Sequence, residues 1–503
     1  MPAPAASRPP RLLGSLLFAL ALAFTATYVV LALLRMTFPF ELEWIEGGSL
    51  AMAHRLVEGL PLYVAPSLRY VPFNYPPLYF WLGSFALRLG GDGFAPLRAI
   101  SLLASLACGA VIYRYVVLET GRRAAGLLAA CLFFATYRLS GSWLDVARTD
   151  SLHLAFLLGG LLVLRTDPSR IRGPVIAAAL VTLAFLTKQS AAVAVAPVVA
   201  TLLVRDRARG IVFAATLLGL AGASVLALDA ASGGWFRYYA FTLAGHYSVD
   251  PALIADFWAR GFFGPLAVAV LGGVLALLLP SQPTAPRGRD VTWAALAGLV
   301  LASWSVRAYP AAFDNVLMPA CAAAALAFGL GWSAALGAAE EAGGERGARI
   351  LRLVYVAAIL QFATLLYNPV AQLPGRNDAA DGARLVDGLR RVPGTVLVPC
   401  HPFMTARAGK GEHFHEMAYA AVAKSGVDTT ATRLRGQWLQ ALRERRWGTI
   451  VLDKADWLWA EVEDRYRPEI PVFPDDQGFW PVTGMRRRPE VIFVPKPDSA
   501  AVR

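Results

Sequence analysis

Long apolar stretches recur along this chain, and short polar segments separate them. The stretches run over residues 12–34, 98–118, 124–140, 150–165, 173–187, 190–204, 210–229, 261–280, 291–307, 315–335 and 350–368. Most approach the roughly 20 residues that a helix needs to cross the bilayer core. The pattern predicts a polytopic α-helical membrane protein with about eleven spans.

The first apolar stretch could be mistaken for a secretory signal peptide. It extends from Leu12 to Leu34, longer than the roughly 7–15 residues of a signal core, and no small-residue cleavage site follows it. We therefore interpret it as a retained first span.

Arginines gather in alternate loops between the predicted spans. By the positive-inside rule, these loops and the N-terminus face the cytoplasm. The residues are Arg8, Arg11, Arg122, Arg123, Arg165, Arg170, Arg172, Arg205, Arg207, Arg209, Arg287, Arg289, Arg346, Arg349 and Arg352. A short apolar segment at 77–89 would invert this alternation if it crossed the membrane, so we expect it, like residues 47–58, to form an interfacial helix on the outer side.

The last part of the chain has a different pattern. From residue 369 onward, charged residues of both signs are frequent, and short apolar runs at 395–399, 449–453 and 491–495 alternate with helical stretches near 380–391, 412–424, 431–446 and 455–466. Such alternation is typical of a small layered α/β domain. We predict two domains: a transmembrane domain over residues 1–368, with a first outer loop at 35–97, and an extracytoplasmic α/β domain over 369–503.

Composition agrees with this architecture. The 503 residues are 56% hydrophobic and only 16% charged, and the mean hydropathy is +0.50. A soluble domain usually has about a quarter charged residues. The net charge of +12 is carried largely by the loop arginines, so it does not indicate nucleic-acid binding. The four cysteines are scattered and offer neither a disulfide framework nor a CxxC metal motif.

The most unusual polar segment is FPFELEWIEGG, residues 38–48, directly after the first span. It places Glu41, Glu43 and Glu46 among aromatic residues. Each carboxylate could simply be solvated at the headgroup level. A carboxylate shielded by aromatic side chains instead has a raised proton affinity, which suits a general base.

Three further polar clusters fall on the predicted outer side. GSWLDVARTDSLHL begins at residue 141, LTKQSA at 186 and VRAYPAAFDN at 306. Asp145 and Arg148 would share a face if their segment were helical, and they could form a plain salt bridge. Cations on the outer side oppose the positive-inside bias and favour an anionic ligand such as a lipid-linked phosphate, although lipid headgroups would also explain them. These cations are Arg148, Lys188 and Arg307.

We expect a substrate cavity at the outer side, near these clusters. Asn74 and Tyr75 precede the interfacial helix at 77–89 and would face it. Its other candidate lining residues are Asp150, Gln189 and Asn315. The tail adds His401, His413 and His415, which we interpret as surface histidines, because an isolated His-x-His pair is a weak metal signal. No glycine-rich phosphate loop occurs in the tail, so we predict no nucleotide site.

Taken in order, these motifs resemble the GT-C superfamily of membrane glycosyltransferases, in the family-39-like branch that contains protein O-mannosyltransferases and lipid A aminoarabinose transferases. The resemblance rests on EWIEGGSLAMAHRLVEGLPLY, YPPLYFWL, DVARTDSLHLAF, LTKQSA and DNVLMP, which cover about the first 200 residues well and the rest thinly. The family commonly has an Asp-Glu pair after its first span, whereas this chain has Ile45 and Glu46, with Glu43 two residues upstream.

The resemblance implies a glycosyltransferase, moving a hexose or pentose from a polyprenyl-phosphate donor to a glycan, lipid or protein acceptor. Its catalytic residues would be Glu43, Glu46 and Asp145, with Glu43 favoured as the base. Arg148, Lys188 and Arg307 would bind the donor phosphate.

No cofactor is required, although a divalent metal could lie between Glu43 and Asp145. Membrane lipids are expected partners and nucleic acid is not. The expected location is a bacterial cytoplasmic membrane with the site outside. A transporter or lipid flippase, and a non-catalytic scaffold, are the alternatives.

Overall fold

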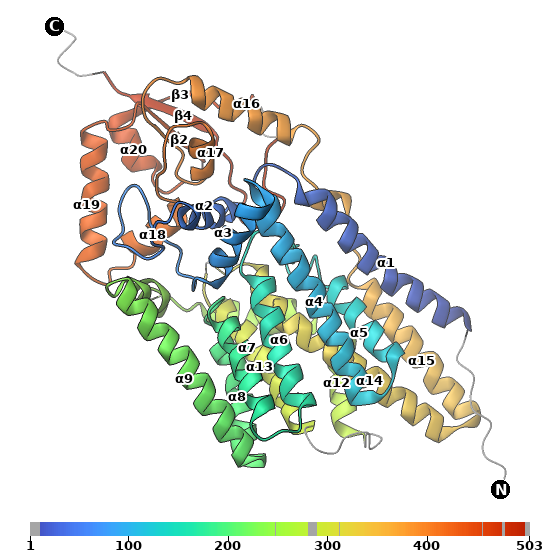
Figure 1. Cartoon of the computed structure of the whole chain (residues 1–503). Coiled ribbons are helices and arrows are strands. Elements are labelled where there is room, and N and C mark those ends of the chain that lie inside the picture. The colour runs from blue at the N-terminus through green and yellow to red at the C-terminus, as the bar shows by residue number, and fades with distance from the viewer. Residues whose placement is uncertain are drawn as a thin grey trace.

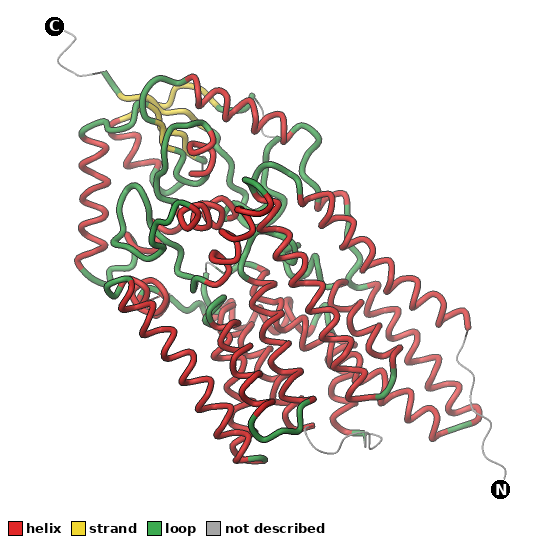
Figure 2. Tube along the Cα trace, viewed as in Figure 1, coloured by secondary structure: helices red, strands yellow, loops and turns green. Residues whose placement is uncertain are grey.

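The computed structural model describes residues 11–246, 248–279, 289–310, 312–454, 456–474 and 478–497. A slanted bundle of helices forms most of the molecule, and a smaller mixed layer lies across one end of it (Figure 1). We call this end, where residues 37–97 and the C-terminal tail lie, the capped end. Figure 2 shows that the strands are confined to this tail.

Each predicted span corresponds to a helical segment of the bundle. The bundle helices are α1 (Arg11–Met36), α4 (Phe94–Thr120), α5 (Arg123–Ala135), α6 (Asp150–Thr166), α7 (Arg172–Phe185), α8 (Ala191–Arg205), α9 (Arg207–Ala231), α12 (Ala267–Leu278), α13 (Arg289–Arg307), α14 (Met318–Ala342) and α15 (Gly344–Ala363). Short irregular helices join them at the capped end: α10 (Trp235–Arg237), η1 (Tyr238–Thr242), η2 (Ala244–His246), α11 (Pro251–Asp256), η3 (Phe257–Phe263), η4 (Asp314–Leu317) and η5 (Val370–Gln372).

Length and composition identify a smaller set of full membrane spans. Among the described residues, four helices are long and apolar enough to cross a bilayer: Arg11–Met36, Phe94–Thr120, Arg207–Ala231 and Asp314–Ala342. A fifth is obtained if Pro251–Phe263 and Ala267–Leu278, which meet at 82°, form one broken span. Several others end early; α5 stops at Ala135, where polar turns begin, although the apolar run predicted helix to residue 140.

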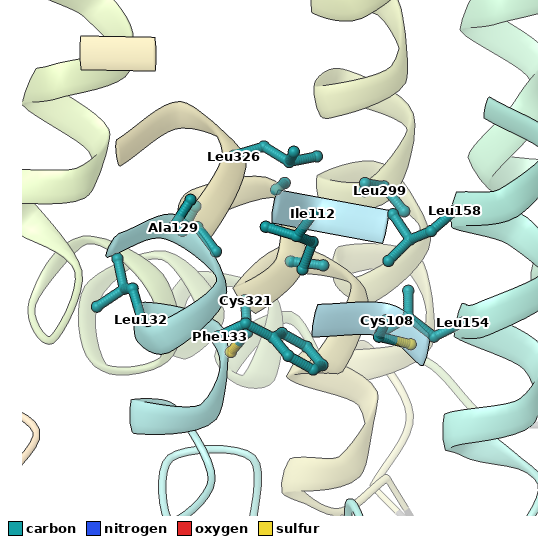
Figure 3. Packing of buried hydrophobic residues seen from close by; sticks show 14 of the residues in the cluster. Cys108, Ile112, Ala129, Leu132, Phe133, Leu154, Leu158, Leu299, Cys321 and Leu326 are labelled. Atoms are coloured by element: carbon teal, nitrogen blue, oxygen red, sulfur yellow. The ribbon is translucent and has the colours of Figure 1, made fainter. Parts of the chain in front are cut away.

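Small residues allow the bundle to pack closely around α14. Of its most apolar stretch, 83% is buried, against 6% for that of α9. Figure 3 shows Cys321 and Leu326 of α14 packed among Ile112, Ala129 and Phe133 of α4 and α5. A Cβ added at Gly329 would lie 2.8 Å from Val116, so glycine permits this close helix approach.

The first capped-end loop contains the two interfacial helices that the sequence predicted. They are α2 (Glu46–Val57) and α3 (Leu78–Gly90), which pack on each other. Thirteen residues give α3 a length of roughly 20 Å, short of the roughly 30 Å hydrocarbon core. It lies beside α2 at the capped end and not along the bundle (Figure 1).

The tail forms a four-stranded mixed sheet with helices around it. The strands are β1 (Val396–Leu397), β2 (Thr449–Leu452), β3 (Tyr466–Pro471) and β4 (Val491–Pro495), in the order β1-β2-β4-β3. β1 and β2 are parallel; the other pairs are antiparallel. The helices are α16 (Asp378–Arg391), α17 (Pro402–Arg407), α18 (Glu416–Ala423), α19 (Thr429–Arg443) and α20 (Trp459–Arg465). β3 and α17 were not predicted.

The tail and the first capped-end loop share one hydrophobic core. Phe403 of α17 packs against Phe40 and Phe94, with ring centroids 6.3 and 5.2 Å apart. The ring of His415 lies 5.5 Å from that of Trp44. The domain division at residue 368 stays a prediction, and the shared core means that the tail is anchored on the loop that carries the acids.

Candidate functional site

The three carboxylates of residues 38–48 are buried between the bundle and the tail. Glu43 and Glu46 have no exposed surface, and Glu41 is 8% exposed. The Glu46 backbone N–H donates to the Glu43 carbonyl in the turn that begins α2, at 2.9 Å. Each carboxylate has a different cationic partner, and these partners distinguish what the three acids can do.

Glu46 is fully occupied by hydrogen bonds. Arg98 donates to both of its oxygens, at 3.0 and 2.7 Å, and the backbone N–H groups of Leu42 and Ala147 donate at 2.7 and 2.6 Å. Burial by itself raises the pKa of Glu46, but Arg98 and the two amides outweigh burial and bring the pKa below the ordinary value. Glu46 is therefore an ionised anchor that joins the first capped-end loop to residues 141–149.

Glu43 is held at one oxygen only. Arg148 donates to Oε2 at 2.7 Å and, through its other nitrogen, to the Tyr75 hydroxyl at 2.9 Å. Within the described part of the chain, the second oxygen, Oε1, has no hydrogen-bond partner. Burial raises the pKa of Glu43 to about 8, although Arg148 opposes this. A buried carboxylate with a free oxygen and this proton affinity can accept a proton near neutral pH.

A helical segment would have favoured an ion pair between Asp145 and Arg148, but the two side chains do not pair. Residues 141–149 form successive turns, and Asp145 forms an ion pair with Arg35 at 3.2 Å and accepts from the Tyr137 hydroxyl at 3.0 Å. Burial raises the pKa of Asp145 above its ordinary value, while Arg35 opposes the change. Arg35 thus neutralises Asp145, which leaves Arg148 to Glu43.

Lys188 lies in a second polar group next to this network. Its ammonium contacts Asp150 at 2.6 Å, and the Asn315 amide donates to the same Asp150 oxygen at 3.0 Å. A cavity of about 10 Å³ adjoins them, lined in part by His153 and Pro319. This volume holds about one water molecule, so any larger ligand must displace side chains here.

Gln189, a predicted cavity residue, joins two neighbouring segments, whereas Arg307, a predicted phosphate ligand, has other partners. The Gln189 amide donates to the Asn74 carbonyl at 2.7 Å and to that of Ala240 at 3.0 Å. Arg307 instead pairs with Asp314 at 3.4 Å and Asp256 at 3.8 Å. No described contact joins it to the other two predicted phosphate ligands, so its role stays a prediction.

Two buried arginines of the site were not predicted from the sequence, and three histidines lie in a different environment from the predicted one. Arg35 and Arg98 are cations on the predicted outer side, as Arg148 is, and so they also oppose the positive-inside bias. Neither was singled out as a candidate site residue. The prediction of surface histidines was wrong: His401, His413 and His415 are all buried. The tail folds onto the loop, and His401 Nδ1 bonds directly to Glu41 Oε2, a contact between residues 360 positions apart.

The site offers little support for a resident divalent metal. The described residues contain no group of three His, Cys, Asp or Glu side chains placed to hold an ion. Glu43 and Asp145, between which a metal was considered, are each neutralised by an arginine. The charge of each carboxylate is therefore already compensated in this structure.

Comparison with known proteins confirms the resemblance found in the sequence. Residues 74–235 match a protein family described as dolichyl-phosphate-mannose-protein mannosyltransferase. No curated protein sequence matches the chain. The matched segment includes Tyr75, Arg148 and Lys188.

Solved structures show the same fold at low sequence identity. ArnT from Cupriavidus metallidurans, bound to undecaprenyl phosphate, aligns with a TM-score of 0.62 and 13% identity over 95% of this chain and 98% of that chain. Its apo state gives 0.57 and 13% over 94% and 97%. The apo oligosaccharyltransferase from Archaeoglobus fulgidus gives 0.51 and 12% over 88% and 73%. The chain thus has the fold of these polytopic membrane transferases.

Proposed function

We propose that this protein is a membrane glycosyltransferase that moves a sugar from a polyprenyl-phosphate donor to a hydroxyl of a glycan, lipid or protein acceptor. The observation that carries the proposal is the pairing of Glu43, a buried carboxylate with one free oxygen, with Arg148. Lys188 lies nearby at the same end of the bundle. The ArnT fold, solved with undecaprenyl phosphate bound, supports a lipid-phosphate donor.

In the proposed reaction, Glu43 Oε1 takes the proton of the acceptor hydroxyl. The hydroxyl oxygen forms a bond to the anomeric carbon as the bond from that carbon to the phosphate oxygen breaks. The electron pair leaves with the phosphate, whose growing negative charge is stabilised by Arg148 and Lys188. Attack opposite the leaving group inverts the anomeric configuration, and the phosphate leaves readily, so no nucleotide is needed.

Donor binding requires the two cations to change partners. Lys188 is held by Asp150, and Arg148 by Glu43 and Tyr75. A phosphate placed between them would attract both cations away from these carboxylates. Because Arg148 lowers the proton affinity of Glu43, its movement toward phosphate would make Glu43 a stronger base when the donor is bound.

The other predicted residues have supporting roles in this scheme. Asp145 neutralises Arg35, and Glu46 joins the loops around the site. Asn74, Gln189 and Asn315 border the sugar position. The arginine-rich loops at the opposite end of the bundle support a bacterial cytoplasmic membrane with the N-terminus inside, and the site and tail outside.

The proposal is tested by sugar transfer from a panel of radiolabelled polyprenyl-phosphate sugars, using purified protein and membrane extract as acceptor. Wild type should release labelled product, and Glu43→Gln should lose it by at least about a hundredfold, the usual minimum contribution of a general base. Asp145→Asn should lower transfer less, because Asp145 is proposed to act through Arg35.

Glu46→Gln provides the matched control among the acids. Both variants break a buried ion pair, but Glu46 also accepts hydrogen bonds at both oxygens from Arg98 and two backbone amides, so Glu46→Gln should lower the unfolding temperature more than Glu43→Gln does. Transfer that persists in all three variants would rule out the proposed base. Folded wild-type protein that transfers no sugar from any donor would favour a lipid transporter.

A further inference from the structure

A segment of the tail lies directly on the proposed base. We call residues 481–487 the tail strap. The Thr483 backbone N–H donates to the Leu42 carbonyl at 3.1 Å, and Thr483 forms an isolated parallel β-bridge with Glu43. The Thr483 hydroxyl donates to the Gly141 carbonyl. The tail strap therefore joins the two capped-end loops that carry Glu43 and Arg148.

The next residue, Gly484, lies against the free oxygen of Glu43. A Cβ built on Gly484 would stand 2.9 Å from Glu43 Oε1, 3.0 Å from its Cγ and 3.3 Å from the Trp143 ring. Its φ of +77° also lies in the left-handed region that glycine adopts without strain. Glycine is therefore required here for both backbone conformation and space, and Oε1 has no hydrogen-bond partner among the described residues.

We propose that Thr483 and Gly484 are positioning residues for Glu43: they fix its carboxylate and shield Oε1 from water, so that the tail completes the catalytic base. This inference rests on the proposed function, because it assigns a role in that reaction. It also explains how one glutamate in a loop next to a membrane surface has no exposed surface at all.

The surroundings of Glu43 indicate in which direction its pKa should change when the tail strap is altered. The charged groups that act on its carboxylate are Arg148, which also donates to the Tyr75 hydroxyl, and Glu46 at the start of α2. Burial is the largest influence on the pKa of Glu43 and raises it to about 8. Admitting water to Oε1 should therefore lower this pKa.

The test compares Gly484→Ala with Gly394→Ala. Gly394 has the same φ of +77° in the same tail, but its added Cβ meets nothing within 4 Å. Both variants therefore place alanine at the same left-handed φ, and only Gly484→Ala adds a methyl group against Glu43. We expect Gly484→Ala to lower kcat by about tenfold or more, and Gly394→Ala to retain it.

The pH profile separates positioning from a general structural defect. A base works when deprotonated, so wild-type activity should rise with pH through the pKa of Glu43. In Gly484→Ala and Thr483→Ala this rise should move to lower pH by about one unit or more, whereas Thr483→Ser, which keeps the hydroxyl, should resemble wild type. If Gly484→Ala does not fold, Thr483→Ala, which adds no atoms, carries the test.

A measurement without turnover keeps this inference distinct from the proposed function. The carbonyl stretch of protonated Glu43 can be followed by infrared difference spectroscopy across a pH titration and assigned by its absence in Glu43→Gln. A lower titration midpoint in Thr483→Ala supports the inference even if no donor is used. Midpoints and pH profiles equal to those of Gly394→Ala in both strap variants would overturn it, while wild-type transfer would still support the glycosyltransferase.

Discussion

At the scale of single residues, one short stretch contains three glutamates with three different environments. Glu46 uses both oxygens in hydrogen bonds, Glu43 uses one, and Glu41 is bonded to a histidine from the tail. Environments that separate the proton affinities of neighbouring carboxylates are a common way to separate their roles. The sequence pointed to the acids, but their partners lie on other helices or in the tail, so it could not rank them.

The Glu41–His401 contact predicts a pH dependence of stability. Burial alone would lower the pKa of His401, but the carboxylates of Glu41 and Asp453 outweigh it and raise the pKa to about 10. The folded protein thus keeps a proton that the unfolded chain loses near pH 6.5. The stabilisation is complete below that pH and is lost as pH rises through about 10.

This dependence is measurable as the unfolding temperature between about pH 7 and pH 10, a range above the Glu41 pKa of about 7. Wild type should lose several degrees across it, and His401→Gln should show a shallower decline. His246→Gln removes an exposed histidine of η2 and serves as the control. Equal slopes in wild type and His401→Gln would contradict the prediction.

At the scale of elements, long apolar stretches predicted the helices of the bundle reliably, whereas two short elements of the tail were missed. The bundle helices and α2, α3, α16, β2 and β4 lie where the sequence predicted helices or strands. β3 was missed because YRPEIP contains two prolines and mostly exposed residues; it is an edge strand set by its pairing with β4. α17 has six residues and packs on α2, a contact that local sequence does not reveal.

The start of α2 is shaped by close packing, which leads to a stability prediction. A Cβ added at Gly48 would lie 2.1 Å from the Phe73 ring. Gly48→Ala should therefore destabilise the protein by about 1–3 kcal/mol, the usual cost of overpacking a core. Thermal unfolding in detergent, followed by tryptophan fluorescence, measures the change.

The matched control for Gly48→Ala is Gly388→Ala in α16. This glycine is also within a helix, but a Cβ there meets nothing within 4 Å. Alanine favours helix over glycine by roughly 0.5–1 kcal/mol, so Gly388→Ala should raise stability slightly. If both variants raised the free energy of unfolding, helix propensity and not contact with Phe73 would govern the effect at Gly48.

At the scale of the whole molecule, the site lies where two differently composed parts meet. The bundle supplies Arg35, Arg98 and Lys188, and the tail supplies His401 and the tail strap. The sequence predicted an apolar helical bundle and a mixed α/β tail; their division at residue 368 and the side of the membrane on which they meet stay predictions. It could not predict that they share a core, because hydrophobic contacts between residues hundreds of positions apart leave no periodic signal in the chain.

The arrangement of loops at the two ends of the bundle predicts the orientation in the membrane. The four native cysteines are all buried, so a single introduced cysteine can be labelled above a low background. Glu463 in the tail and Arg346 at the opposite end of the bundle are both exposed.

In intact cells with a permeabilised outer membrane, an impermeant thiol reagent should label Glu463→Cys, whereas Arg346→Cys should react only after lysis. The two ends are separated by the bilayer, so each variant is the control for the other. Labelling of Arg346→Cys in intact cells, with Glu463→Cys protected, would place the tail and the Glu43 site in the cytoplasm, on the side opposite to the proposed one.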